Sequence, residues 1–263
     1  MKKLIITIIA LISSLTILSG CTSAGQSSGD KKTFTVGFDQ NFPPYGYVDE
    51  NGEYTGFDLD MAAEVAKRLD LELKLQPIDW DSKDHELSSK AIDCIWNGFT
   101  INGREDDYTW TEPYMDNSQV FVVKSSSGIK SFEDLKDKIV TAQTDSAALK
   151  ALESDDYKDL TASFKELVVR GEYNTAFMEL EAGAVDAIAM DIGVAKFQVS
   201  GKEDQYVILE KPLVEEQYGI GFLLGNTELR DKVQATLKEM VADGTFEKIS
   251  IEWFGYNVGI LEE

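Results

Sequence analysis

Cysteine, histidine and basic residues are all scarce in this sequence, and each shortage narrows what the protein can be. Among 263 residues there are two cysteines, Cys21 and Cys94, so no framework of disulfide bonds can hold the fold together. The one histidine, His85, lies at a polar helix start, which indicates the surface. Cys94 lies in an apolar run and has only His85 as a possible histidine base, so we interpret it as a core residue and not as a catalytic thiol.

The shortage of basic residues gives the chain a strong negative charge. Lysine and arginine together number 25 against 47 aspartates and glutamates, and the formal net charge is −22 at pH 7. Nucleic-acid-binding proteins present a basic face, so this charge argues against a nucleic-acid partner. On an exported protein, negative charge commonly serves solubility, and we infer no ligand from it.

Long apolar runs are missing beyond the start of the chain, which has the composition of a targeting segment. A Lys2-Lys3 pair precedes an apolar stretch over residues 4–17, and Leu18-Ser-Gly-Cys21 closes it. Leucine, a small residue, glycine and cysteine form the pattern of a bacterial lipoprotein cleavage site, after which Cys21 would carry the lipid. We therefore predict a lipoprotein signal peptide over residues 1–21. An ordinary signal peptide with a chance cysteine is the alternative.

The residues after this segment predict an anchored but otherwise soluble protein. Residues 22–32 are rich in serine, glycine and lysine, which is typical of a flexible tether. No later run approaches the roughly 18 apolar residues of a membrane span. We expect the folded part to lie on the extracytoplasmic face of the cell membrane, attached only through the lipid.

From residue 33 onward, strand-like and helix-like apolar patterns alternate, which predicts an α/β fold with a helix-covered parallel sheet. Asp58 is the expected N-cap of the first helix. The predicted helices include residues 57–69, 173–182 and 227–243. The predicted strands include residues 33–38, 71–78, 92–96, 119–124, 138–142, 164–170, 184–191 and 217–224.

The stretch from Ala91 to Arg104 contains a candidate anion-binding site. A short apolar strand is expected to end in a turn at Asn97-Gly98, followed by a polar loop that carries Thr100. Gly98 allows a ligand close to the backbone, Thr100 can donate hydrogen bonds, and the planar guanidinium of Arg104 fits a carboxylate. Taken alone, the stretch fits an anion site and a strand end with a surface arginine equally well.

Polar and aromatic residues gather where other predicted strands end. Ligands of open α/β sheets lie beyond the carboxyl ends of strands, so two such sheets would present these residues to one cleft. Arg104 and Asp191 suit the carboxylate and the ammonium of a small zwitterion, and Phe42 and Trp80 could enclose its side chain. Singly, Asp191 is better explained as a turn cap and Trp80 as a core residue, but their shared location at strand ends favours the site. The full set of strand-end candidates is Asp39, Phe42, Trp80, Thr100, Arg104, Thr144, Ser146 and Asp191.

Several short motifs carry a family resemblance that covers residues 33–257. By these motifs the chain resembles the extracellular solute-binding protein family 3, the amino-acid-binding components of ABC importers. The motifs are Gly37-Phe-Asp-Gln-Asn-Phe-Pro-Pro-Tyr45, Gly56-Phe-Asp-Leu-Asp60, Gly98-Phe-Thr-Ile-Asn-Gly-Arg104, Trp110-Thr-Glu-Pro-Tyr114, Gly183-Ala-Val-Asp-Ala-Ile-Ala-Met-Asp191, Gln217-Tyr-Gly-Ile220 and Trp253-Phe-Gly255.

The resemblance implies a role for each candidate residue. Arg104 would clamp the α-carboxylate of an amino acid, and Asp191 would bind its α-amino group. Asp39 and Phe42 would contact the ligand side chain, and the aspartate indicates a side chain that donates hydrogen bonds. Gln143, Thr144, Ser146 and Met190 stand at second-lobe positions, where Gln143 and Met190 would tune the choice of ligand.

The resemblance also implies a two-lobed periplasmic-binding-protein type II fold, with two open sheets, helices on both faces and a two-strand hinge. Lobe one would comprise residues 33–121 plus 219–263, and lobe two residues 122–218. A bound amino acid would favour closure, and the closed monomer would dock on the membrane subunits of an ABC permease. No cofactor, metal ion or nucleic acid is expected.

Two other functions remain open from the sequence. Some exported enzymes share the fold, cyclohexadienyl dehydratase among them, and a cleft carboxylate could serve as a general acid or base. We expect no enzyme, because no nucleophile–base pair or cluster of metal ligands stands out. A sensor domain would carry a further signalling segment, which we do not expect after the last helix.

Overall fold

The computed structural model describes residues 32–262. The predicted signal peptide, its Cys21 and residues 22–31 of the predicted tether lie outside the described residues. Within residues 32–262, no helix combines the length and the apolar character that crossing a membrane requires.

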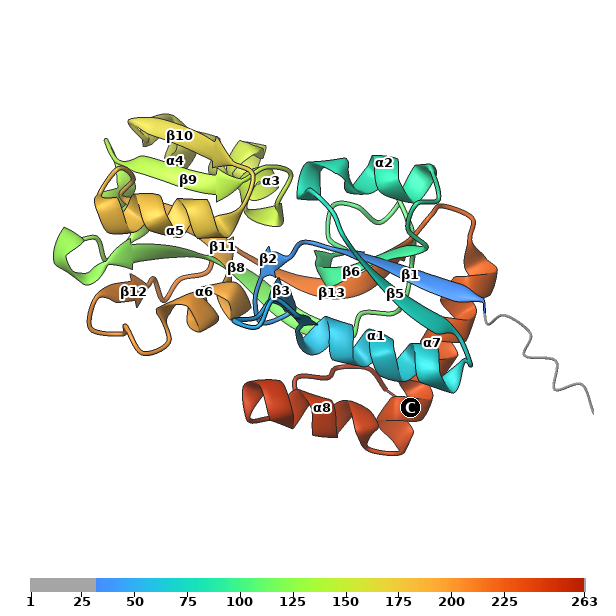
Figure 1. Cartoon of the computed structure of the whole chain (residues 1–263). Helices are drawn as coiled ribbons and strands as arrows, with labels where there is room; N and C mark the ends of the chain where they lie inside the picture. The colour runs from blue at the N-terminus through green and yellow to red at the C-terminus, as the bar shows by residue number, and fades with distance from the viewer. Residues whose placement is uncertain (1–31, 263) are drawn as a thin grey trace, which may run out of the picture. The chain divides into compact units, whose positions relative to one another are not determined.

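Ten strands form one mixed sheet that runs the length of the fold (Figure 1). Its strand order is β10-β9-β11-β8-β13-β6-β1-β5, with β12 beside β8 and β7 beside β13. The strands are β1 (Thr33–Phe38), β5 (Glu72–Pro77), β6 (Cys94–Thr100), β7 (Thr109–Trp110), β8 (Met115–Lys124), β9 (Ile139–Gln143), β10 (Glu166–Arg170), β11 (Ala187–Asp191), β12 (Tyr206–Ile208) and β13 (Val214–Phe222). A separate small sheet consists of β2 (Asn41–Phe42), β3 (Gly46–Val48) and β4 (Tyr54–Thr55).

Each end of the main sheet contains three parallel strands. β1 pairs in parallel with β5 and β6, a group that we call the β1 side. β9 pairs in parallel with β10 and β11, which we call the β9 side. The predicted alternation of strands and helices is thus confirmed, and the carboxyl ends of β1, β6, β9 and β11 carry most of the candidate site residues.

Two long antiparallel strands, β8 and β13, join the two sides. Residues 214–218 pair with residues 115–119, so the two expected sheets are hydrogen-bonded into one. Both strands begin earlier than predicted. In β8, the polar sequence Asp116-Asn-Ser118 resembles a loop, but its backbone is paired with β13. The predicted lobe boundaries, at residues 121/122 and 218/219, fall within these strands and stay a prediction.

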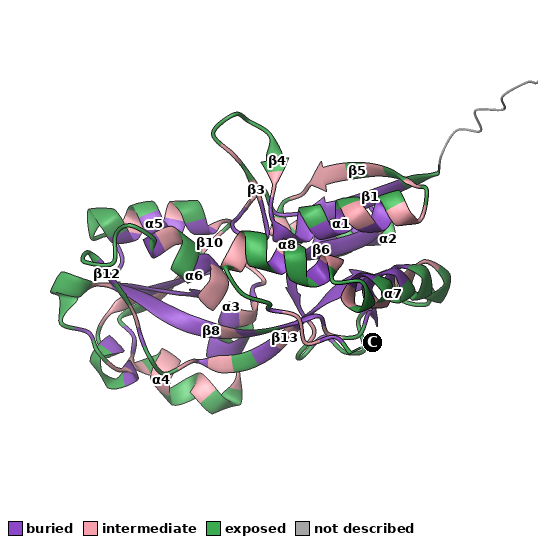
Figure 2. Ribbon diagram, turned by 90° about the horizontal axis from the view of Figure 1, so that it is seen from below, coloured by how far each residue is buried: buried purple, intermediate pink, exposed green. Residues whose placement is uncertain are grey.

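Helices pack on both faces of the sheet, so its central strands are buried on both sides (Figure 2). In β6, Cys94 and Trp96 belong to one apolar cluster and Ile95 and Phe99 to another. Cys94 is fully buried, as predicted, and His85 is exposed. The helices are α1 (Phe57–Arg68), α2 (Lys83–Ser88), α3 (Ala147–Glu153), α4 (Lys158–Ser163), α5 (Tyr173–Ala182), α6 (Ile192–Val199), α7 (Thr227–Ala242) and α8 (Thr245–Phe254).

A buried carboxylate connects α1 to the site-bearing strand β6. Asp58 lies inside α1, so its prediction as the N-cap is wrong, and Gly56 holds that position. The Asp58 side chain accepts hydrogen bonds from the backbone N–H of Gly98, at 2.6 Å, and from the hydroxyl of Tyr114, at 2.9 Å. The carboxylate thus accepts the backbone N–H of Gly98, for which the neighbouring strand supplies no acceptor. This hydrogen bond fixes the backbone of β6 at Gly98.

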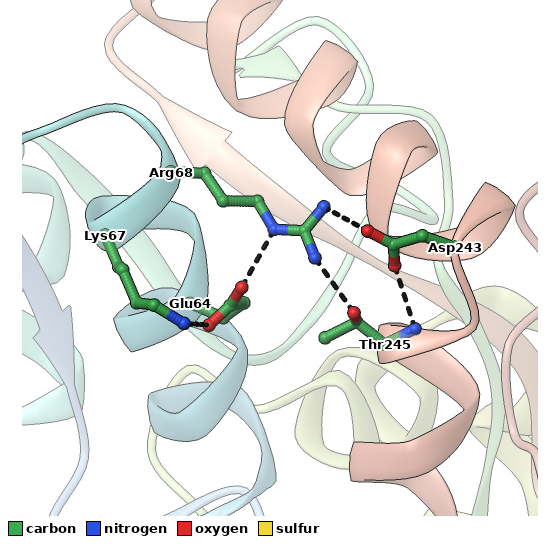
Figure 3. Close-up of polar contacts among 5 residues, drawn as sticks. All are labelled: Glu64, Lys67, Arg68, Asp243 and Thr245. Atoms are coloured by element: carbon green, nitrogen blue, oxygen red, sulfur yellow. Dashed lines mark hydrogen bonds and ion pairs between the residues drawn. The ribbon is translucent and has the colours of Figure 1, made fainter.

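An ion-pair network at the end of α1 holds the last two helices (Figure 3). The guanidinium of Arg68 contacts Glu64 at 2.9 Å, Asp243 at 2.8 Å and the hydroxyl of Thr245 at 2.8 Å. Hydrogen bonding from Arg68 is the main cause that lowers the pKa of Asp243 to about 2. Because these groups are partly exposed, the network orients α7 and α8 more than it stabilises the fold.

The start of α1 rests on the loop between β2 and β3. The carbonyls of Pro44 and Tyr45 accept the N–H groups of Phe57, at 2.8 Å, and Asp58, at 3.0 Å. Gly56 makes this possible with a φ of +147°, and a Cβ atom there would lie 2.2 Å from the carbonyl oxygen of Tyr45. A glycine is therefore required both by conformation and by space.

We predict that Gly56→Ala costs about 1–3 kcal/mol more stability than Gly52→Ala, because only the former adds a backbone clash to the conformational cost. Gly52 is the matched control, since its φ is +83° and a Cβ atom added there would have no neighbour within 4 Å. Urea unfolding of both variants measures the difference. Equal losses of unfolding free energy would show that the contact between α1 and this loop is not tight.

Candidate functional site

A small cavity lies where the carboxyl ends of the parallel strands of the two sides approach one another. Eight of the ten predicted ligand-binding residues line it, and Asn97 and Ala147 line it without having been predicted. Asp39 and Thr144 were predicted but are not in its wall. The lining residues are Phe42, Trp80, Asn97, Gly98, Thr100, Arg104, Gln143, Ser146, Ala147 and Asp191.

Gly98 shapes the cavity floor from within β6. The sequence predicted a turn at Asn97-Gly98, but both residues lie inside the strand, where both faces are covered. Gly98 has a φ of +56°, and a Cβ atom would lie 3.0 Å from the ring of Phe42 and 3.1 Å from that of Tyr218. The turn-like sequence thus marks a local backbone distortion and a close ring approach within a strand.

Arg104 is a buried cation whose hydrogen bonds go to main-chain carbonyls. Its side chain is 3% exposed. The guanidinium donates to the carbonyls of Asp145, at 2.8 Å, and Thr100, at 3.3 Å, and lies 5.3 Å from the ring centroid of Phe99. Burial lowers its pKa, while more distant acids oppose that shift.

This guanidinium has no ion-pair partner among residues 32–262. A buried charge is costly unless an opposite charge compensates it. Two of the five N–H donors of Arg104 bond carbonyl groups of the chain. The arrangement therefore suits a carboxylate that enters the cavity.

On the opposite wall, Asp191 binds three donors through one of its two carboxylate oxygens. Its Oδ1 accepts from the side-chain amides of Asn117 and Gln119, each at 2.8 Å, and from the hydroxyl of Tyr218. Burial, followed by the charge of Glu216, raises the pKa of Asp191 to about 7. The group lines the cavity and can accept hydrogen bonds from an ammonium.

Thr100 and Glu216 form a contact that the sequence did not suggest. The Thr100 hydroxyl donates to Glu216 at 3.0 Å, so it is engaged within the chain and not directed at a ligand. Glu216 also accepts from the amides of Asn117, at 2.6 Å, and Gln119, at 2.7 Å. The sequence signal that could have found this cluster is the two-residue period of a strand. It places Asn117 and Gln119 on one face of β8, and Glu216 and Tyr218 on one face of β13.

Asp39 faces a neighbouring side chain instead of the cavity. Its Oδ2 accepts from the Gln143 amide at 2.8 Å, and its Oδ1 accepts from the N–H of Asn41 at 2.8 Å. Thr144 uses its N–H to bond the carbonyl of Arg170 at 2.8 Å. Met190 is fully buried in the apolar core and does not line the cavity.

Several contacts bridge the β1 side and the β9 side around the cavity. Gln143 reaches Asp39, Lys83 forms an ion pair with Asp145, and Asn174 donates to Asn41 at 3.0 Å. Lys83 is 1% exposed, and burial is the main cause that lowers its pKa to about 8. These contacts draw the two walls together.

Aromatic rings and one short helix complete the wall. The ring of Phe42 lies 6.0 Å from that of Tyr173, and Trp80 meets Phe99 edge-on at 5.3 Å. The predicted helix start at Ser146 is confirmed, because its hydroxyl accepts the N–H of Leu149 at 3.1 Å and caps α3. Among the described residues, no group of three or more His, Cys, Asp or Glu side chains could hold a metal ion.

Comparison with known proteins finds relatives over most of this chain. The model of the bacterial extracellular solute-binding proteins, family 3, matches residues 34–256. The L-cystine-binding protein TcyJ of Escherichia coli is 30% identical over 234 residues, which cover 87% of this chain and 85% of that protein.

Solved structures show the same fold. A substrate-binding protein of an ABC uptake transporter from Streptococcus pneumoniae, with bound histidine, has a TM-score of 0.83 at 32% identity and covers 87% of this chain and 95% of its own. An ancestral arginine-binding protein bound to arginine has a TM-score of 0.79 at 36% identity, covering 86% and 99%. An ancestral amino acid-binding protein, described as a precursor of cyclohexadienyl dehydratase, has a TM-score of 0.76 at 31% identity, covering 84% and 95%. The fold is therefore the two-lobed type II fold of periplasmic binding proteins, as predicted.

We predict that Asp39→Asn changes how stability depends on pH. Burial raises the pKa of Asp39 from 3.8 to about 6, so folding favours its protonated form. Its stabilising contribution is complete below about pH 4 and is lost as the pH rises through 6, which amounts to about 3 kcal/mol. The excess stability of the wild type over the variant should therefore fall by about that much between pH 4 and pH 8. Urea unfolding across this range measures it, and a constant difference would contradict the buried state of Asp39.

Proposed function

Because the chain belongs to the bacterial extracellular solute-binding proteins, family 3, we propose that it binds a polar amino acid outside the cytoplasm and delivers it to an ABC-type permease. The observation that carries the proposal is the buried guanidinium of Arg104 without an ion-pair partner among residues 32–262, in one cavity with Asp191. An α-amino acid supplies the two complementary charges on one carbon atom. The carboxylate would meet Arg104, and the ammonium would meet Asp191.

The expected strength of binding follows from these contacts. Each charge-assisted hydrogen bond contributes about 1.5–3 kcal/mol net, so three or four of them give micromolar or tighter affinity after the costs of association. Phe42 and Trp80 would cover the ligand side chain with rigid apolar faces. Gln143 would contribute hydrogen-bonding groups that favour a polar side chain, and Asp39 would hold the Gln143 amide in place.

Delivery would depend on closure of the two lobes about β8 and β13, with lobe one at residues 33–121 plus 219–263 and lobe two at residues 122–218. The bridging contacts, such as Gln143 to Asp39, belong to the closed form. A ligand favours that form only by its higher affinity for it, and contact with both walls supplies such a difference. The closed monomer would then dock on the membrane permease.

The protein would be held at the outer face of the cell membrane by a lipid on Cys21, after removal of residues 1–20. A catalytic role is the weaker candidate. The hydroxyls of Thr100 and Ser146 in the cavity wall are engaged with Glu216 and with the α3 backbone, and His85 lies exposed outside it. We therefore propose binding without chemical conversion.

A thermal-shift screen against the twenty amino acids, cystine and ornithine tests the class of ligand. We expect a polar amino acid to raise the melting temperature, since a ligand that binds only the folded state stabilises it by mass action. The same compound without its α-carboxyl group, as the free amine, should give no shift. If no amino acid gives a shift, the proposal fails; conversion of a prephenate-like acid would favour the enzyme instead.

Substitution of the two charged residues tests the site. We expect Arg104→Gln or Asp191→Asn to weaken binding of the screened amino acid at least about 30-fold, which corresponds to the loss of one charge-assisted contact. Arg170→Gln is the matched control, since Arg170 pairs with Glu179 outside the cavity. Titration calorimetry measures affinity, and circular dichroism checks folding. Unchanged affinity in either site variant would refute the assignment.

A further inference from the structure

Two buried carboxyl groups share the same two amide nitrogens at the junction of β8, β11 and β13. Asn117 Nδ2 lies 2.8 Å from Asp191 Oδ1 and 2.6 Å from Glu216 Oε1. Gln119 Nε2 lies 2.8 Å and 2.7 Å from the same two oxygens. An amide group carries two hydrogens, so each can serve both carboxyl groups at once. The four atoms form a closed ring, and we call Asp191 and Glu216 with these amides the acid pair.

The acid pair contains more acceptors than donors. One hydroxyl is added on each side, from Tyr218 to Asp191 and from Thr100 to Glu216. The remaining amide oxygens, Asn117 Oδ1 and Gln119 Oε1, are buried and have no hydrogen-bond partner in the described part of the chain. Buried acceptors without donors are costly, so the cluster favours an added proton or an added cationic donor.

The surrounding charges do not neutralise the pair. Neither carboxyl group forms an ion pair with a lysine or arginine of residues 32–262. The groups that face it are Arg104 from the loop after β6, Tyr45 from the loop after β2, Tyr173 from α5 and Tyr218 from β13. Burial raises the pKa of all three tyrosines well above the ordinary value, so they stay neutral. Arg104 is thus the cation among these groups: its charge opposes the rise in the pKa of Glu216, but it forms no ion pair with that carboxyl group.

Desolvation and like charge act together on the two acids. Burial is the largest cause that raises the pKa of both, and the charge of Glu216 is the second cause for Asp191. Two carboxyl groups at such close quarters do not readily ionise together, and one proton between them relieves both the repulsion and the shortage of donors.

The two acids differ in what they can touch. Asp191 lines the ligand cavity, whereas Glu216 does not. Glu216 instead borders an open groove along the other side of β8 and β13, together with Asn117 and Tyr45. A ligand in the cavity would thus reach Asp191 only, and Glu216 could act on it only through Asp191 and the shared amides.

We propose that Glu216 is a positioning residue that controls the charge of Asp191, so that the empty site holds one proton between the two carboxyl groups and releases it to solvent when a ligand ammonium binds. The release rests on the proposed function, in which Asp191 receives that ammonium. The carboxyl O–H bond breaks, its proton passes to water or buffer, and an N–H of the ligand ammonium takes its place as hydrogen-bond donor. Because Glu216 stands on β13 and the amides on β8, the charge of the site is controlled from the strands that join the two sides.

The proposal predicts a pH dependence of binding with a defined sign. Above the pH range in which the two carboxyl groups lose their shared proton, no proton needs to leave on binding, and the affinity for the ligand is constant. Below it, each ligand displaces a proton, and affinity falls up to tenfold per pH unit. Glu216→Gln removes the like charge while its carbonyl oxygen can still accept the same three donors. The fall in affinity should therefore begin at lower pH in this variant.

Calorimetry with L-arginine and L-glutamine between pH 5 and pH 8 tests the release, since neither probe titrates in that range. In buffers of different ionisation enthalpy, the wild type should release close to one proton per ligand near pH 5.5 and none near pH 8. Between pH 7 and pH 6 its affinity should fall several-fold, and that of Glu216→Gln less than about twofold. Glu215→Gln removes the same charge from an exposed neighbour on β13 and should behave as wild type. A uniform loss of affinity at all pH values in Glu216→Gln, or no proton release, would overturn the proposal.

Urea unfolding of the ligand-free protein separates the acid pair from the proposed function. A carboxyl group whose pKa is raised in the folded state stabilises the fold below its unfolded pKa, and the effect is lost as pH rises through the folded value. The fall in stability between pH 5 and pH 8 should be smaller in Glu216→Gln than in wild type and Glu215→Gln. Equal slopes would refute the pair itself. A smaller pH dependence of stability in Glu216→Gln, together with no binding of any screened amino acid, would support the acid pair. It would refute the proposed function and, with it, the proton release.

Discussion

The antiparallel pairing of β8 with β13 is the interaction on which the rest of the fold depends. It joins the β1 side to the β9 side through the register that sets Val214 against Gln119 and Tyr218 against Met115. The same register brings inward-facing polar side chains of both strands to the end of β11. A one-residue slip would turn those side chains to the opposite face and dissolve the cluster around Asp191. The pairing therefore determines architecture and site chemistry together.

The parts of the site that lie at strand ends could be predicted from sequence. Arg104 and Asp191 stand just after or at the end of apolar runs, and parallel strands bring their carboxyl ends to one edge. Both accordingly line one cavity. The same rule located Trp80, Gln143 and Ser146, because it depends only on chain order and on the alternation of strands with helices.

Side-chain partners could not be predicted in this way. Asp39 bonds Gln143 across 104 residues, and Thr100 bonds Glu216 across 116 residues, so neither contact has a local signal. Asp58 has the composition of a helix cap, yet a distant strand draws it into the core. In β8, Asp116-Asn-Ser118 resembles a turn because these residues hydrogen-bond locally in isolation, but here β13 supplies the backbone partners. Tertiary pairing overrides local preference in each case.

The ion pair between Lys83 and Asp145 has a consequence for the time that a captured molecule stays inside. Lys83 is nearly inaccessible to solvent, so dissolved salt screens the pair much less than a surface pair. The Asp145 carbonyl also accepts a hydrogen bond from Arg104, so the same loop contacts the arginine that is proposed to bind the ligand carboxylate. Under the proposed function, an occupant would leave the cavity only after these contacts had separated. The residence time of the ligand would then depend on the rate at which the protein opens as well as on the contacts with the ligand. It could change while the affinity of the closed cavity for the ligand stays the same.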